Sequence, residues 1–141
     1  MEKISVPRDT LLTRAGEKNN LLHKITKGEV LIFAINKTTV IPLGKVGPGD
    51  FLGELSYFDK GPSSAYALAL TPAEVEVYQR EELDNEIPSW LKEFGISLSK
   101  KIRNNDLALE KSNYRPRQVG ESIKLDIEEQ RRLYTLVNQP K

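Results

Sequence analysis

The first half of the chain consists of short apolar runs, each bounded by turn residues. The runs lie at Leu11–Leu12, Leu21–Ile25, Glu29–Ile35, Thr39–Leu43, Tyr66–Leu70 and Glu74–Tyr78. Turn signals recur roughly every 8–12 residues between them, which is typical of a β-sandwich or barrel. Each run is too short to belong to a parallel βαβ unit. The pattern therefore predicts a β-domain built from short strands.

The hydrophobic pattern changes after Arg80. Apolar residues then recur at helical spacing, at Trp90, Leu91, Phe94, Leu98 and Ile102. This spacing predicts one apolar stripe along a helix of about five turns, and Pro88 suits the first turn of that helix. The simplest interpretation is that the stripe packs against the β-domain. The alternative is a helix that pairs with a second copy of the chain, because the stripe can extend to Leu109.

The segment Asn113–Glu121 separates this helix from the C-terminal residues. It contains Pro116 and Gly120 among charged residues, so we interpret it as a linker or an exposed loop. We accordingly divide the chain into a domain at residues 1–110 and a linker with a short helical tail at residues 111–141.

A last short helix is predicted between Asp126 and Asn138. Asp126 and Glu129 have the spacing of a capping box, which marks a helix start. Three apolar residues then give the helix one apolar edge, namely Leu133, Leu136 and Val137. A lone helix of about three turns is only marginally stable in water. We therefore expect it to dock on its own domain or on a partner.

Composition narrows the chemistry that the chain can perform. Among its 141 residues, Lys and Arg total 21 and Asp and Glu total 20, so a net charge of +1 gives no bulk attraction to nucleic acids or anionic membranes. There is no cysteine, and the single histidine, His23, lies in an expected strand, where a structural role is the simplest. These residues cannot form the usual transition-metal sites. No catalytic or phosphate-loop motif is present, so we expect neither an enzyme nor a bound cofactor or metal.

The N-terminal residues have no apolar core of signal-peptide length. No window approaches the ~18 apolar residues of a membrane span. We therefore expect a soluble, cytoplasmic protein that does not enter membranes.

Two glycine turns and a carboxylate suggest a ligand loop. Residues 47–50 form a tight bend, and Gly53 and Glu54 follow closely. Glycine lets a ligand approach the backbone, and exposed amides in such a turn can bind an anion. Glu54 is suited to accept hydrogen bonds from ribose hydroxyls, and Ser63 and Ser64 could add donors. On this chemistry alone, the segment is either a ligand loop or a structural turn between strands.

The order of these features resembles the cyclic nucleotide-binding domain family, which includes the cAMP receptor protein. The matching residues are Gly28, Gly49, Asp50, Phe51, Gly53, Glu54, Leu55, Pro62 and Ala65. The resemblance covers about residues 5–106. It implies a mainly β fold with some helix, a β-jelly-roll (double-stranded β-helix) followed by C-terminal helices, in agreement with the order of strands and helices expected above.

The resemblance also implies a ligand site formed by Gly53, Glu54, Leu55, Ser63, Ser64, Ala65 and Tyr66. Glu54 and the backbone of Gly53 match the family positions that meet the ribose, and Ser64 matches the residue beside the cyclic phosphate. Ser63, however, stands where the family has the arginine that neutralises this phosphate. Losing such a charge-assisted pair costs on the order of 1.5–3 kcal/mol, or tenfold to a hundredfold in affinity. Tyr66 replaces a smaller residue, and its ring would reach toward the base.

We therefore expect a non-enzymatic regulatory module that acts in signal transduction through protein–protein interaction and whose nucleotide pocket is degenerate. The alternative is a genuine sensor of cAMP, cGMP or a related small ligand that couples binding to movement of the C-terminal helices. The expected partner is another protein chain, or a second copy through the helix at residues 90–109. Too few residues follow that helix for a helix-turn-helix module, so DNA binding by that route is not expected.

Overall fold

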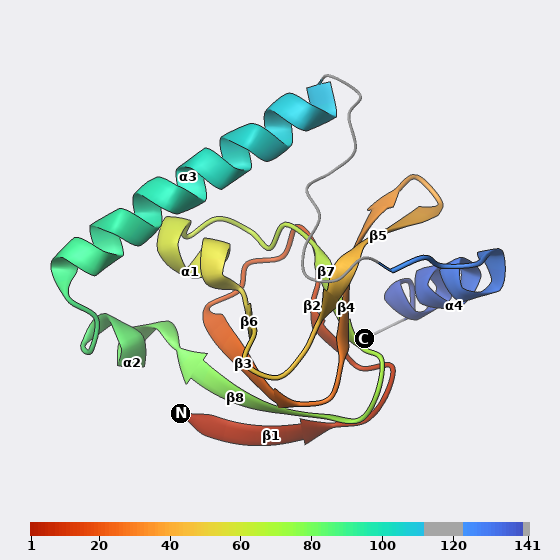
Figure 1. The fold of residues 1–141 in the computed structure, drawn as a ribbon, viewed down its shortest axis with the longest axis horizontal. Coiled ribbons are helices and arrows are strands. Elements are labelled where there is room, and N and C mark those ends of the chain that lie inside the picture. The colour runs from red at the N-terminus through yellow and green to blue at the C-terminus, as the bar shows by residue number, and fades with distance from the viewer. Residues whose placement is uncertain (112–122, 140–141) are drawn as a thin grey trace.

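The computed structural model shows two four-stranded antiparallel sheets packed face to face, with helices around them (Figure 1). The structure describes residues 1–111 and 123–139. The first sheet has the strand order β1 (Glu2–Val6), β8 (Ala73–Gln79), β3 (Leu21–Lys27) and β6 (Phe51–Leu52). The second has the order β2 (Leu11–Thr13), β7 (Tyr66–Ala69), β4 (Val30–Asn36) and β5 (Thr39–Val46). This arrangement confirms the expected jelly roll with C-terminal helices.

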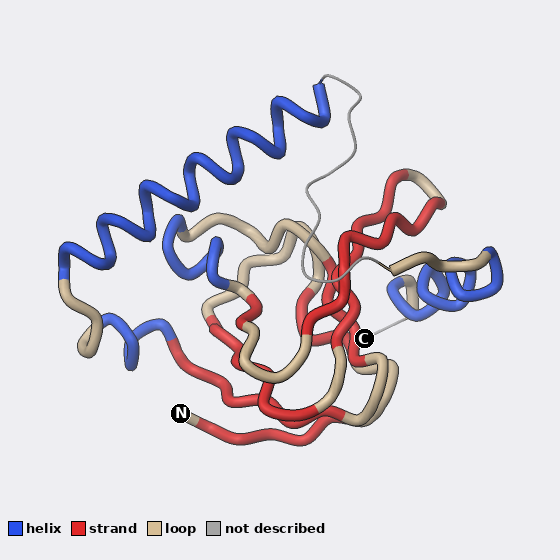
Figure 2. The backbone as a smooth tube through the Cα atoms, viewed as in Figure 1, coloured by secondary structure: helices blue, strands red, loops and turns tan. Residues whose placement is uncertain are grey.

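Four helices accompany the sheets in the described residues. Helices are blue in Figure 2. The short α1 (Glu54–Asp59) lies between β6 and β7, and α2 (Arg80–Asp84) follows β8. The long α3 (Ser89–Lys111) crosses over α1, and α4 (Ile127–Val137) lies beside the second sheet. The hydrophobic pattern missed β1, because Ile4 and Val6 are its only inward-facing apolar side chains and give too short an alternation.

Strand β4 explains why the sequence "VLIF" is apolar without interruption. Val30 and Ile32 enter the core between the two sheets, whereas Leu31 and Phe33 point to the opposite face. All four side chains are buried. A strand covered on both faces needs apolar residues at successive positions, whereas a half-exposed strand alternates.

Helix α4 provides the cover for that outer face. Leu133 and Val137 are buried against Leu31, Phe33 and Leu68. The expected capping box is present, since the Asp126 carboxylate accepts from the Glu129 amide at 2.8 Å. Two polar contacts fix the helix further: Arg14 Nη1 donates to the Val137 carbonyl at 2.8 Å, and Arg132 pairs with Asp9. Of the two docking surfaces expected for this helix, its own domain or a partner, the structure shows its own domain. The division of the chain near residue 110 stays a prediction, and the expected linker lies mostly outside the described residues.

The apolar stripe of α3 does not pack against the β-domain, so the simplest interpretation of the sequence was wrong. The first four residues of the stripe are exposed: the exposed fraction is 68% for Trp90, 37% for Leu91, 57% for Phe94 and 43% for Leu98. The helix instead meets α1 through small residues, Gly95 and Ser99, which a hydropathy pattern does not register. The pairing of this stripe with a second copy stays a prediction.

His23 is a core residue, as the structural interpretation of the sequence expected. It lies opposite Leu52 and Val77 and is 5% exposed, and its Nδ1 atom has no hydrogen-bond partner in the described part of the chain. Burial disfavours the charged imidazolium and lowers the pKa of His23 from its ordinary value of 6.5.

Replacing His23 with leucine should therefore reduce the acid sensitivity of the fold. The unfolded chain binds the proton of His23 more tightly than the folded chain, so the wild type loses stability as the pH falls below 6.5. Urea unfolding at about pH 7.5 and about pH 5 measures this loss, which should be smaller in His23→Leu. The chain has one histidine, so an equal loss in the two proteins would contradict this assignment.

Candidate functional site

The expected ligand loop begins at Gly53, the residue that caps α1. Its φ of 90° lies in the left-handed region, which favours glycine. A Cβ atom at this position would lie 2.8 Å from the Leu21 carbonyl oxygen and 3.0 Å from Asn19 Nδ2. Both the backbone angle and the close approach of β3 therefore require glycine here. This requirement alone accounts for Gly53 as a structural residue.

Glu54 and Leu55 form the first turn of α1. Glu54 is exposed, and its negative charge at the start of the helix complements the helix dipole. Leu55 is half-buried. Glu54 also lines a cavity of about 530 Å³ that opens between α1, α2 and the β6 edge of the first sheet. It is the one expected site residue among those that line this cavity, which does not contain Ser63, Ser64, Ala65 or Tyr66.

Ser63 is held firmly at the position where the family arginine is expected. Its side chain is buried, its amide donates to the Glu17 carbonyl at 3.0 Å, and its carbonyl accepts from the Gly16 amide at 2.9 Å. The preceding Pro62 forms a bridge with Lys18. The backbone groups of Ser63 are thus paired with the turn at residues 16–18, and a ligand would have to compete for them.

The residues after Ser63 point in different directions. Ser64 is exposed, and Ala65 packs against the core between the sheets. Tyr66 stacks on Phe33, with ring centroids 5.2 Å apart, in the cluster beneath α4. The expectation that the Tyr66 ring reaches a bound base is therefore wrong. Side chains alternate along β7, so the position next to an inward-facing alanine faces outward.

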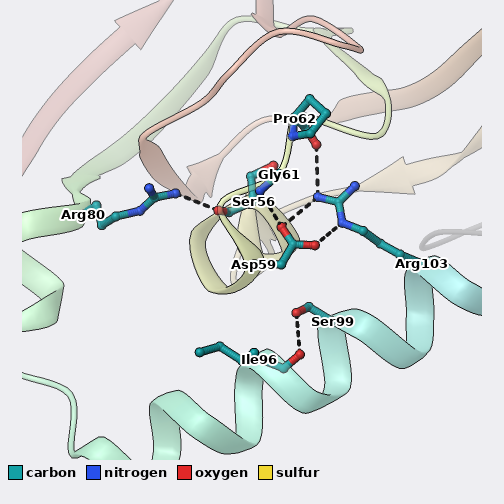
Figure 3. A network of polar contacts seen from close by, with 8 residues as sticks. All are labelled: Ser56, Asp59, Gly61, Pro62, Arg80, Ile96, Ser99 and Arg103. Carbon is teal, nitrogen blue, oxygen red and sulfur yellow. Dashed lines mark hydrogen bonds and ion pairs between the residues drawn. The ribbon is translucent and has the colours of Figure 1, made fainter.

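Hydrogen bonds from Arg103 connect helix α3 to the segment just before Ser63 (Figure 3). Arg103 donates to both carboxylate oxygens of Asp59 and, at 3.0 Å, to the Pro62 carbonyl. The side chains of Arg103 and Asp59 are 25% and 11% exposed. Asp59 also accepts from the Gly61 amide at 2.8 Å. Arg103, Asp59 and the Pro62 carbonyl form what we call the α3 clamp.

A second set of contacts joins α1 to α2 and to the start of α3. Arg80 donates to the Ser56 carbonyl at 2.7 Å, as Figure 3 also shows. The Tyr57 hydroxyl donates to Asp84 at 3.1 Å, and Lys92 pairs with the same carboxylate at 3.1 Å. Burial and this hydrogen bond raise the pKa of Tyr57 to about 12, whereas the hydrogen bond from Lys92 lowers the pKa of Asp84. A displacement of α1 would therefore disturb contacts of both α2 and α3.

Sequence reasoning did not find Asp59, Arg80 or Arg103. A signal existed for one of them, because Gly95, Ser99 and Arg103 follow one another at four-residue spacing and so share a face of α3. The structure brings this face onto α1, where Ser99 is 1% exposed.

Neither a metal-binding cluster nor a membrane-spanning helix is present in the described residues. Within them, no group of three or more His, Asp or Glu side chains is arranged to hold a metal ion. No helix of residues 1–111 or 123–139 is long and apolar enough to cross a bilayer. The polar groups described above join α1, α2 and α3 to one another.

The α3 clamp should contribute measurably to stability. In a double-mutant cycle with Asp59→Asn and Arg103→Gln, we expect a coupling energy of about 1–2 kcal/mol, because the pair is largely shielded from water. The exposed pair Lys27–Glu74, at 3.5 Å, is the matched control and should couple by less than about 0.5 kcal/mol. Urea unfolding of the single and double variants measures both energies, and equal coupling in the two cycles would contradict a special role for the clamp.

Comparison with known proteins gives a family match. The sequence matches the cyclic nucleotide-binding domain family over residues 3–88. A search of curated proteins found no match.

Several solved structures share the fold. The catabolite activator protein of Thermus thermophilus is 25% identical, with a TM-score of 0.64 over 79% of this chain and 55% of that chain. The c-di-GMP-responsive global regulator CLP of Xanthomonas campestris is 22% identical, with a TM-score of 0.58 over 79% and 58%. The cAMP-bound EAL enzyme Bd1971 is 20% identical, with a TM-score of 0.69 over 79% and 30%. The chain thus spans from under a third to just over half the length of these proteins. The family match and the shared fold lead to one conclusion: the chain belongs to the cyclic nucleotide-binding domain family.

Proposed function

We propose that this chain is a non-enzymatic regulatory module that acts by binding another protein chain and whose nucleotide pocket has lost most of its affinity for cyclic nucleotides. Domains of this family are generally regulatory rather than catalytic. Such a module would work in the cytoplasm, and the absence of cysteine is compatible with a reducing compartment. The observation that carries the proposal is the environment of Ser63.

A cyclic phosphate at this loop would find few available donors. Ser63 offers a neutral hydroxyl where a guanidinium fork would bind two phosphate oxygens. Its amide is already paired with Glu17. Arg103 of α3, which contacts this loop, is already engaged by Asp59 and the Pro62 carbonyl. A phosphate would therefore have to displace an internal carboxylate to reach this charge, which supports weak binding.

The surface of α3 supports a second copy of this chain as the partner. Leu91, Phe94 and Leu98 are spaced by three and four residues, the pattern of a seam between paired helices. The adjacent face of α3 is occupied by α1, so this seam is directed away from its own domain. The same seam on two copies is self-complementary, as a two-fold dimer requires.

A small-ligand sensor is the second candidate function, and two buried atoms favour it. Asn19 Nδ2 lies against Gly53, and His23 pairs across the sheet with Leu52, the residue before Gly53. Asn19 Nδ2 and His23 Nδ1 both lack a hydrogen-bond partner among the described residues. Buried polar atoms are normally satisfied. A ligand hydroxyl near Gly53 would satisfy them if the sheets opened to admit it. For a sensor, Glu54→Ala should abolish any thermal stabilisation by cAMP or cGMP.

Restoring the family arginine should restore nucleotide binding. In calorimetry with cAMP and cGMP, we expect the wild type to bind more weakly than micromolar and Ser63→Arg to bind about tenfold to a hundredfold more tightly. Ser97→Arg adds the same charge at an exposed position of α3 and should leave affinity unchanged. Micromolar or tighter binding by the wild type would contradict the degenerate pocket and favour the sensor.

Disrupting the α3 seam should separate the dimer. Phe94→Glu places a charge in the middle of the seam, so sedimentation should show a monomer under conditions where the wild type is dimeric. Ile127→Glu makes the same change at another apolar residue, one that is 65% exposed on α4, and should leave the dimer intact. A wild type that sediments as a monomer, or a Phe94→Glu variant that remains dimeric, would contradict this interface.

A further inference from the structure

The exposed face of α3 changes from apolar to polar part of the way along the helix. Lys101 lies seven residues after Phe94, and Asn105 lies seven residues after Leu98, so both lie on the face that carries the α3 seam. Both are exposed. At a rise of about 1.5 Å per residue, the apolar part of this face, from Trp90 to Leu98, is only about 12 Å long. A second copy must therefore cover a short apolar segment that a lysine follows.

A parallel pair of α3 helices fits this face poorly. With two-fold symmetry and parallel helices, each residue of the seam faces the same residue of the partner. Phe94 would then face Phe94, but Lys101 would face Lys101, and two ammonium groups in such a position repel each other. Asn105 would likewise face Asn105. The parallel arrangement therefore places a lysine pair and an asparagine pair in the continuation of the seam.

An antiparallel pair matches the apolar segment to itself. With Phe94 opposite Leu98 of the partner, Leu98 also lies opposite Phe94 of the partner, and the two apolar segments cover each other. Three residues further along, Leu91 meets Lys101 of the partner. The methylene chain of Lys101 can pack on Leu91 while its ammonium group reaches the neighbouring ring of Trp90, which is 68% exposed.

The charges beside the seam also favour the antiparallel arrangement. Glu93 and Lys100 are exposed and seven residues apart, so they lie on the same flank of α3. In the antiparallel pair, Lys100 of one copy lies beside Glu93 of the other. Exposed charges of opposite sign contribute little affinity, but they select one orientation over another.

We propose that two copies of this chain pair through the α3 seam in antiparallel orientation, with Lys101 of each copy against Trp90 of the other. This inference rests on the proposed function, which supplies the dimer but not its orientation. The two-fold axis of the pair then crosses α3 between Phe94 and Leu98. The start of each α3, which follows α2, is covered by the middle of the other α3.

Disulfide cross-linking tests the orientation, because the chain has no cysteine of its own. Leu91→Cys and Lys101→Cys proteins are mixed in equal amounts in a glutathione redox buffer, and the disulfides are identified by mass spectrometry. In the antiparallel pair the two different cysteines meet, whereas equal cysteines lie about ten residues of helix, or about 15 Å, apart, too far for a disulfide. We therefore expect the mixed disulfide as the main product. Ile127→Cys, at an exposed position of α4, is the control for random collision and should form none.

The other outcomes separate a wrong orientation from a wrong dimer. Disulfides between equal cysteines, in a wild type that sediments as a dimer, would overturn the antiparallel orientation and leave the α3 dimer standing. A dimeric wild type that gives neither kind of disulfide would overturn the orientation and the α3 seam as the interface. A monomeric wild type would overturn the proposed dimer and this inference with it.

Mixing the wild type with a Lys101→Glu variant tests the orientation without a cross-link. In the antiparallel pair, residue 101 of each copy contacts Trp90 of the other, so mixed dimers should form in the proportion expected by chance from the two homodimers. In a parallel pair, Lys101 of one copy would face the new glutamate of the other, and mixed dimers would be in excess. Native mass spectrometry at low ionic strength measures the proportions, and an excess of mixed dimers would overturn the proposal.

Discussion

Helix α3 can lie on α1 because residue 95 has no side chain. A Cβ atom at Gly95 would stand 2.2 Å from the Phe58 ring, well inside any possible contact distance. One turn further along, Ser99 is almost fully buried and returns its hydroxyl to the Ile96 carbonyl at 2.8 Å, so it needs no partner across the interface. One turn beyond Ser99, Arg103 makes the last contact of this row through the α3 clamp. This row of two small residues and one arginine determines how close α3 lies and which face it turns outward.

The contact between α1 and the small residues of α3 determines which face of α3 points outward. Trp90, Phe94 and Leu98 cannot also face α1, since Gly95 and Ser99 occupy that side of the helix, and so the largest apolar side chains of α3 stay in water. An apolar stripe of this kind on a long helix is characteristic of an interface. The small-residue face therefore determines that the apolar stripe of α3 is exposed.

The alternation of side chains along two central strands organises the rest of the molecule. Along β4 and β7 every second side chain enters the core between the sheets, and the intervening ones support α4. Tyr66 belongs to the second set, so the end of the expected ligand loop is joined to the layer beneath α4. At the other side of the loop, Arg14 binds the last turn of α4 and lies two residues before Gly16, which holds Ser63. The C-terminal helix thus supports the loop from two directions.

Much of the fold could be predicted from sequence because its signals are local. Turn residues and apolar runs located most strands, the capping box located α4, and the glycine pattern located Gly53 and Glu54. The stripe of α3 was assigned to the wrong neighbour, because an apolar stripe looks the same whether it packs on its own domain or faces outward. Gly95 and Ser99 carry no hydropathy signal. Asp59 and Arg103 are 44 residues apart, and no local pattern links a pair that only the fold brings together.

The central claim is that the small-residue face of α3 holds α1 and the loop in place. Hydrogen–deuterium exchange of a Gly95→Ala variant tests it most directly, with Ser97→Ala on the exposed side of the same helix as the control. The account predicts faster exchange at residues 54–64 in Gly95→Ala alone, while β3 and β8 keep their protection. Unchanged exchange at residues 54–64, or the same acceleration in Ser97→Ala, would contradict it.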